Sequence, residues 1–316
     1  MSPDAALGPG EQAVTFHSMR GHRLSGVLRL PAGAGPDAPA AAVVLCQGLS
    51  GVKHLVLPEV AAHLAAHHGL ASLRFDYTGC GRSEGEPGWI DPRARVDDAL
   101  YALAVLAAHD AVDDTRLGAY GHSYGGPVAI ALAARDHRVR ALASVSGPGD
   151  GEDMLRAVRA SWDWVAFRDQ VQAARAERAV HGTERRVDVG HIFPFSPAFL
   201  ATYQALTAGG GTSAMAAGDQ DDHRFVLASV DAMVDFRPSD AARHLAGCAA
   251  LLVNGTDDDT AAIETVEPVY ANLPGPKRWC RLPGLDHNDL DADPGLGRAL
   301  DEVGAWFDRH LGEQRR

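Results

Sequence analysis

Ser123 is the residue whose surroundings most directly predict chemistry. It lies in Gly121-His122-Ser123-Tyr124-Gly125, with a strand-like run before it (116–122) and a helical pattern after it (124–134). A nucleophile on such a sharp strand-to-helix turn has a strained backbone, and side chains at the flanking glycine positions would clash. The pattern therefore predicts a serine nucleophile, with N–H groups of the helix N-terminus facing the negative charge that develops during attack.

A serine hydroxyl needs a general base, and the base needs an acid that orients it. His287 is the only histidine in segment 282–288, which follows the last predicted strand. Segment 254–259 follows the strand before that and contains Asp257, Asp258 and Asp259. We predict His287 as the base and Asp258 as the acid, with Asp257 and Asp259 as alternatives. His122 is expected to project away from the site.

Two backbone N–H groups are needed to bind an oxyanion. Tyr124, directly after the nucleophile, is expected to provide one of them. The other is expected from loop 47–51, which follows the apolar run 41–46, and Leu49 is our choice because a backbone donor does not require a polar side chain. The side chain of Gln47, or the hydroxyl of Ser50 or Tyr124, could add a hydrogen bond at this site. Gln47 is therefore also a candidate substrate contact.

The elements that position these residues alternate along the chain. Strand patterns cover 14–17, 24–30, 41–46, 71–76, 116–122, 139–146, 249–254 and 278–282, and helical patterns cover 54–68, 96–109, 124–134 and 296–311. Strands that alternate with helices imply crossover connections and a mainly parallel sheet. The sequence therefore predicts the α/β class, with a doubly wound and mostly parallel sheet.

The alternation stops after the sixth strand. Between 148 and 236 no strand-like run occurs, and helical stretches such as 154–180 and 197–206 dominate. We predict an α/β core formed by 1–147 and 237–316, with a helical cap at 148–236. Aromatic side chains under a cap suit an apolar substrate pocket, and they equally suit packing of the cap on the core. The insert contains Trp162, Trp164, Phe167, Phe193, Phe195, Phe199 and Tyr203, of which Trp162, Phe167 and Phe193 are candidate substrate contacts.

Composition excludes several classes of partner. The 316 residues have a formal net charge of -12, whereas nucleic acids and anionic membrane surfaces require basic patches. No apolar run is long enough to cross a bilayer, and the first residues lack the features of a signal peptide. We expect a cytoplasmic enzyme with a small-molecule substrate, no nucleic-acid or membrane partner, and a helical insert compatible with a homodimer.

The cysteines and the clustered histidines predict no cofactor site. Four cysteines lie far apart without a Cys-x-x-Cys pair, which is typical of buried thiols in a reducing compartment. Cys248 and Cys280 fall on strands expected to be neighbours, so these two could approach each other. His63 and His67 have an i, i+4 spacing, but a solvated helix face explains them better than a metal site. We expect neither a metal nor a cofactor.

The ordered motifs resemble those of the α/β-hydrolase superfamily. They are Gln47-Gly48-Leu49, the Asp-x-x-Gly-x-Gly-x-Ser-x-Gly stretch 76–85, the 121–126 turn, the 255–258 segment and His287. The 76–85 stretch is similar to the branch with peptidase S15-like, CocE/NonD-like and dienelactone-hydrolase-like members. Two departures are visible: many relatives have His-Gly at 47–48, and the proline expected a few residues after the acid is missing.

The resemblance implies an activity and assigns roles. It makes Ser123, His287 and Asp258 a catalytic triad, with Leu49 and Tyr124 as oxyanion donors, in a serine hydrolase. The motifs do not specify the substrate. With the aromatic residues of the insert, we expect cleavage of a carboxylic ester or related acyl bond of a small, largely apolar substrate. Acyl transfer, lactone formation and C–C bond hydrolysis use the same triad and are alternatives. A non-catalytic binding protein on this fold is a further alternative, although such proteins often lose the acid or the base, which this chain retains.

Overall fold

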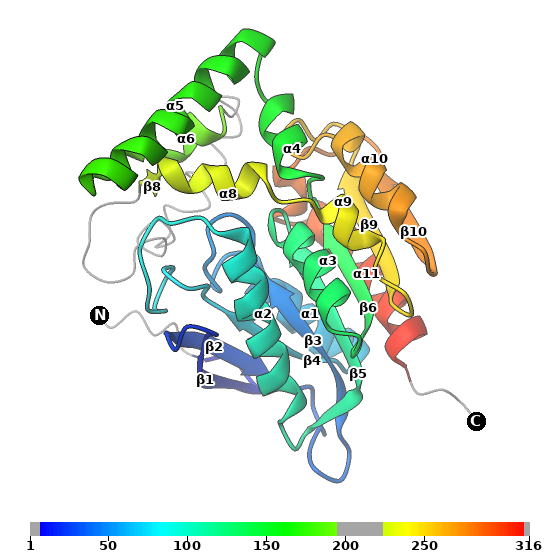
Figure 1. The fold of residues 1–316 in the computed structure, drawn as a ribbon. Coiled ribbons are helices and arrows are strands. Elements are labelled where there is room, and N and C mark those ends of the chain that lie inside the picture. The colour runs from blue at the N-terminus through cyan, green and yellow to red at the C-terminus, as the bar shows by residue number, and fades with distance from the viewer. Residues whose placement is uncertain (1–6, 195–223, 313–316) are drawn as a thin grey trace.

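A computed structural model describes residues 7–194 and 224–312, which form an α/β fold around one large sheet (Figure 1). The sheet has eight strands in the order β1-β2-β4-β3-β5-β6-β9-β10. β1 and β2 pair antiparallel, β2 also pairs antiparallel with β4, and all other neighbours are parallel. The strands are β1 (Glu11–His17), β2 (Arg23–Arg29), β3 (Ala40–Cys46), β4 (Ala71–Phe75), β5 (Val112–His122), β6 (Val139–Val145), β9 (Ala249–Gly255) and β10 (Lys277–Leu282). The predicted fold class is confirmed.

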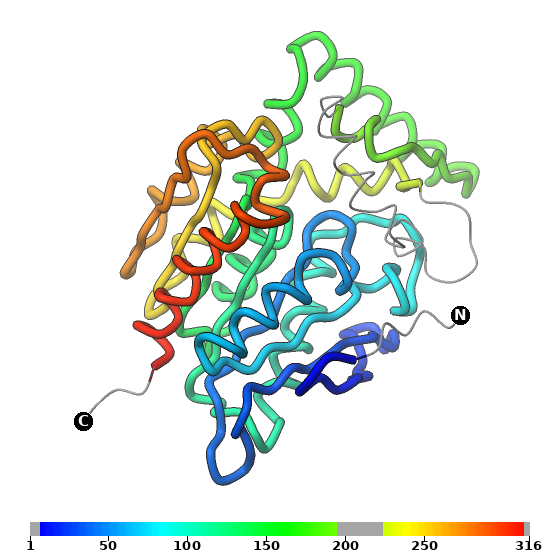
Figure 2. Tube along the Cα trace, turned by 180° about the vertical axis from the view of Figure 1, so that it is seen from behind, coloured from blue at the N-terminus to red at the C-terminus, as the bar shows by residue number. Residues whose placement is uncertain are grey.

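Helices cover both faces of the sheet because its central strands are apolar on both sides. In β3, Ala42 and Val44 pack in one core cluster, whereas Val43 and Leu45 pack in the other. The first cluster includes side chains of α2 (Pro92–Ala107), α3 (Gly125–Arg135) and α10 (Ile263–Asn272). The second includes those of α1 (Leu57–His68) and α11 (Gly295–Leu311), which lie together in the reverse view (Figure 2). The continuous apolar run of β3 thus reflects burial on two faces.

The insert follows β6, and the sheet resumes at β9. Its described elements are α4 (Gly151–Ala157), α5 (Ser161–His181), β7 (Arg186–Val187), α6 (Val189–Ile192), β8 (Phe225–Val226), η2 (Leu227–Ser229) and α8 (Val230–Val234), after which α9 (Pro238–Ala242) leads back to the core. Buried side chains of α4, α5 and α8 form a third apolar cluster. α5 lies above the end of the sheet at which Ser123 is found (Figure 1).

Two predictions for the insert were wrong in detail. The helical stretch 154–180 is two helices, because α4 ends at Ala157 and α5 begins at Ser161. The insert also contains strand structure, since β7 and β8 pair antiparallel over two residues each, too short a run to show a period in the sequence. The predicted helix at 197–206, with Phe195, Phe199 and Tyr203, lies outside the described residues. The boundaries of core and cap remain a prediction.

The side-by-side placement of Cys248 and Cys280 was only half right. β9 and β10 are neighbours, but Cys280 lies opposite Val253, and Cys248 precedes the first residue of β9. All four cysteines are free thiols.

Within 7–194 and 224–312, no helix is both long and apolar enough to cross a membrane.

Candidate active site

The turn around Ser123 is sterically demanding. Ser123 has a φ of 50°, in the left-handed region that non-glycine residues rarely adopt. The flanking glycines are required by contact: a Cβ on Gly121 would lie 2.2 Å from the carbonyl oxygen of Gly125, and one on Gly125 would lie 2.0 Å from that of Cys46. The spacing in the sequence therefore has a physical cause in the close approach of β5, α3 and the end of β3.

Three residues distant in the sequence form a continuous hydrogen-bonded chain. Ser123 Oγ lies 2.9 Å from His287 Nε2, and His287 Nδ1 lies 2.8 Å from Asp258 Oδ2. His287 follows β10 and Asp258 follows β9, so adjacent parallel strands deliver both at the same edge of the sheet. The other oxygen of Asp258, Oδ1, accepts hydrogen bonds from the amides of Thr260 (2.9 Å) and Ala261 (2.7 Å). Both carboxylate oxygens are thus engaged.

Only one of the three candidate aspartates reaches His287. Asp258 is buried, whereas Asp257 and Asp259 are exposed. Asp257 accepts a hydrogen bond from the Thr256 hydroxyl, and its own amide donates to the Leu285 carbonyl. The sequence left open which of the three aspartates is the acid, and the turn after β9 brings only Asp258 to His287.

Burial and the close contact between His287 and Asp258 shift the pKa of both side chains. Burial lowers the pKa of His287, but the charge of Asp258 and its hydrogen bond more than offset this effect, so the pKa lies above the ordinary value of 6.5. Burial raises the pKa of Asp258, and His287 together with the two backbone amides lowers it below its ordinary value. Asp258 is therefore anionic at neutral pH.

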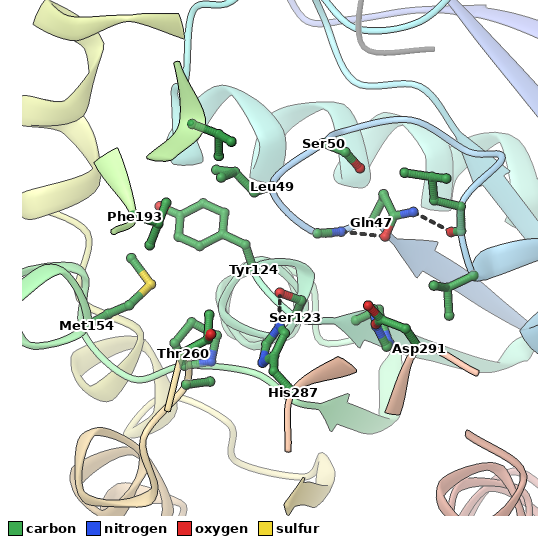
Figure 3. Close-up of a pocket in the computed structure, with 17 residues that line it drawn as sticks. Gln47, Leu49, Ser50, Ser123, Tyr124, Met154, Phe193, Thr260, His287 and Asp291 are labelled. Carbon is green, nitrogen blue, oxygen red and sulfur yellow. Dashed lines mark hydrogen bonds and ion pairs between the residues drawn. The ribbon is translucent and has the colours of Figure 1, made fainter. Parts of the chain in front are cut away.

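The predicted oxyanion donors lie beside this chain. Leu49, Tyr124, Ser123 and His287 line one pocket, and Figure 3 shows them grouped around the Ser123 hydroxyl. Across the described chain, neither the N–H of Leu49 nor that of Tyr124 has a hydrogen-bond acceptor within the protein. Two backbone donors without acceptors next to a serine hydroxyl can bind a negatively charged oxygen.

The side chain of Gln47 is held by hydrogen bonds within its own loop. Its side chain lies in the pocket lining, and Nε2 donates to the carbonyl of Val52. Nε2 also donates to the carbonyl of Leu55, and Oε1 accepts from the amide of Gly48 at 2.6 Å (Figure 3). The amide group is therefore used to shape the loop, and the substrate contact expected of Gln47 stays a prediction.

The fold places the three candidate aromatic residues of the insert in three different environments. Phe193 lines the pocket. Trp162 is 76% exposed on α5, so its prediction as a substrate contact was wrong. Phe167 is buried inside the insert, where it packs on Trp164 and under the Arg159 guanidinium, and it does not belong to the pocket. Which face of α5 turns inward depends on how the helix docks, which the sequence does not show.

Sequence reasoning missed several residues of the site. His122 lines the pocket, contrary to expectation, and its Nε2 lies 2.5 Å from Oδ1 of Asp291, which lines it too. Met154 also lies in the lining. Arg95, on α2, donates to carbonyls of loop 47–51. Arg95 stands directly before Val96, the first apolar residue of the predicted helix 96–109. A cation next to the apolar face of a helix was the sequence feature that could have indicated a buried role.

The histidines on α1 lie beside carboxylates of α11. His63 contacts the rings of His67 and His68, and α11 places Asp301 and Asp308 nearby, carboxylates that the sequence did not indicate. Even so, the described residues contain no group of three or more metal-ligating side chains arranged to hold an ion.

Comparison with known proteins identifies the family. A family model described as the alpha/beta hydrolase fold matches residues 41–294, so this chain belongs to the α/β-hydrolase family. The predicted superfamily is thereby confirmed, and the finer likeness to one branch remains a prediction.

Similar proteins cover nearly the whole chain. It is 26% identical to the polyketide transferase af380 of Aspergillus fumigatus, over 93% of this chain and 94% of that protein. It is 27% identical to a thiohydrolase of Eupenicillium brefeldianum, over 91% of this chain and 90% of that protein. The crystal structure of hypothetical protein PA2218 from Pseudomonas aeruginosa has the same fold, with a TM-score of 0.80 and 22% identity, over 96% of this chain and 95% of that one.

Proposed function

We propose that this protein is a serine hydrolase that cleaves a carboxylic ester, or a related acyl bond, of a small and largely apolar substrate. The observation that carries the proposal is the chain from Ser123 through His287 to Asp258, in which both contacts have hydrogen-bond distances. A serine, a base and an orienting acid in this geometry are the components of nucleophilic acyl transfer.

In the proposed mechanism, His287 Nε2 takes the proton of Ser123 as Oγ attacks the substrate carbonyl. Asp258 holds the imidazole with its proton on Nδ1 and stabilises the cation that forms. The N–H groups of Leu49 and Tyr124 bind the oxyanion. His287 then gives its proton to the leaving group, and water, activated by the same histidine, releases the acid from the acyl-enzyme.

The pocket lining supports an apolar acyl group. Met154, Val189 and Phe193, all from the insert, face the site together with Leu49 and Ala261. Apolar walls with a few convergent polar groups are typical of small-molecule sites. We therefore assign the insert the role of a cap that selects the acyl group.

Acyl transfer is the second candidate function, and the names of similar proteins favour it. Relatives include polyketide transferases as well as a thiohydrolase. A transferase would have the same acyl-enzyme, with a hydroxyl or amine in place of water. Product analysis with and without an added acceptor separates the two, because a transferase yields the acylated acceptor in preference to the free acid.

A fluorophosphonate probe tests the shared first step. It is expected to label the wild type at one site and to leave Ser123→Ala unlabelled. The reason is that Ser123 Oγ attacks the phosphorus of the probe as it would attack the carbonyl carbon of a substrate. Ser50→Ala is a matched control, since Ser50 lines the same pocket and is expected to keep the label on Ser123. Absence of labelling in the wild type, or labelling of Ser123→Ala, would refute the proposal. A panel of esters, thioesters, amides and lactones then identifies the bond.

A further inference from the structure

A buried guanidinium lies against the loop that is proposed to bind the oxyanion. Arg95, on α2, is only 4% exposed. Its Nη1 donates to the carbonyl of Gly48 and its Nη2 to the carbonyl of Leu49, both at 2.8 Å. Burying a guanidinium is costly unless it is hydrogen-bonded, and here consecutive main-chain carbonyls provide the acceptors.

This contact determines the direction of the Leu49 amide. The carbonyl of Gly48 and the N–H of Leu49 belong to one planar trans peptide, so they point in opposite directions. Because Arg95 binds the carbonyl, the N–H faces away from Arg95. The amide of Gly48 on the other side is held by Gln47 Oε1, so the peptide groups on both sides of Gly48 are fixed.

The fixed peptide lies directly against the nucleophile. A Cβ on Gly48 would be 3.2 Å from Ser123 Cβ and 3.6 Å from Ser123 Oγ. A rotation of the Gly48–Leu49 peptide would exchange its donor for a carbonyl oxygen. That oxygen would repel an oxyanion where the amide attracts it.

The same guanidinium also contacts the second proposed donor residue. The Cζ atom of Arg95 lies 5.8 Å from the ring centroid of Tyr124 and 4.9 Å from that of Tyr77. Arg95 thus contacts both residues whose amides are proposed to bind the oxyanion, one through its carbonyl and the other through its ring.

We propose that Arg95 is a positioning residue that aligns the oxyanion donors through the Gly48 and Leu49 carbonyls. The inference rests on the proposed function, because it presupposes attack by Ser123. Arg95 reaches no substrate atom in this proposal, so its loss weakens binding of the tetrahedral state while binding of the ground state is preserved.

The test compares Arg95→Met and Arg95→Lys with Val96→Ala. Val96 is the buried neighbour on α2 and does not hydrogen-bond the loop, so its truncation controls for lost stability of the helix. The measurements are kcat and KM for p-nitrophenyl butyrate, the inhibition constant of a short-chain trifluoromethyl ketone, and Tm. The ketone forms a tetrahedral adduct with an oxyanion, so it reports on the donors directly.

Arg95→Met is expected to lower kcat about tenfold, which is less than the order of 10²–10³ for removal of a whole donor. KM should change little, and the inhibition constant should rise by the same factor as kcat/KM falls. Arg95→Lys, whose ammonium cannot span two carbonyls, should lie between Arg95→Met and the wild type. Val96→Ala should lower Tm and keep kcat within about twofold.

Several results would contradict the proposed role of Arg95. Wild-type kcat in Arg95→Met, or a fall in kcat with an unchanged inhibition constant, would overturn the proposal. If Arg95→Met does not fold, unchanged kcat and inhibition constant in Arg95→Lys would overturn it as well. A wild type that neither hydrolyses the ester nor reacts with the fluorophosphonate would instead refute the proposed function, and this inference with it.

Discussion

Asp258→Asn is the substitution that most sharply tests the proposed role of the acid. Asp258 Oδ1 accepts two backbone hydrogen bonds, and Oδ2 accepts one from His287 Nδ1. In this variant the oxygen of the new side-chain amide satisfies the two backbone donors, so its NH₂ group faces Nδ1. His287 must then accept at Nδ1 and hold its proton on Nε2, where it can no longer take the proton of Ser123.

The expected loss is large because the wrong tautomer blocks the first step. An acid-to-amide change of this kind lowers kcat on the order of 10⁴-fold, or about 5.4 kcal/mol in the barrier. The substitution also removes the main charge that raises the pKa of His287, which leaves burial to lower it. The base acts when neutral, so activity falls as the pH drops through this pKa. The residual activity should therefore persist to lower pH than in the wild type.

The assay is kcat/KM for an aryl ester across pH, with two control variants from the same turn. Asp257→Asn and Asp259→Asn remove exposed charges and are expected to stay within about twofold of the wild type. A larger loss in either control than in Asp258→Asn would refute the assignment of the acid. An acid limb at the wild-type pH in Asp258→Asn would refute the electrostatic reasoning.

Two further changes test the pocket. Asp291→Asn is expected to move the acid limb of kcat/KM to lower pH, because the Asp291 carboxylate raises the pKa of His287; an unmoved limb would contradict this link. Phe193→Ala is expected to lower kcat/KM for a long-chain acyl ester about tenfold more than for an acetate ester, since an apolar pocket contact contributes about 1–3 kcal/mol. Trp162→Ala, on the exposed face of α5, should leave both rates within about twofold, and equal effects of the two substitutions would show that the insert is placed differently.

The sequence alone determined those features that depend on local geometry and chain order. The left-handed turn at Ser123 requires glycines at fixed spacing, and the apolar runs of a doubly buried sheet are continuous, so the nucleophile and most strands were predictable. His287 was predictable because it is the only histidine of the segment after the last strand. The family assignment followed from the same motifs.

Tertiary structure decided which side chains meet. The turn after β9 selected Asp258 over its exposed neighbours, and the docking of α5 turned Trp162 to solvent while Phe193 reached the pocket. Arg95 reaches the carbonyls of Gly48 and Leu49 only because α2 packs against the loop after β3. Periodicity shows that a helix has two faces, but the partner of each face depends on contacts between segments distant in the sequence.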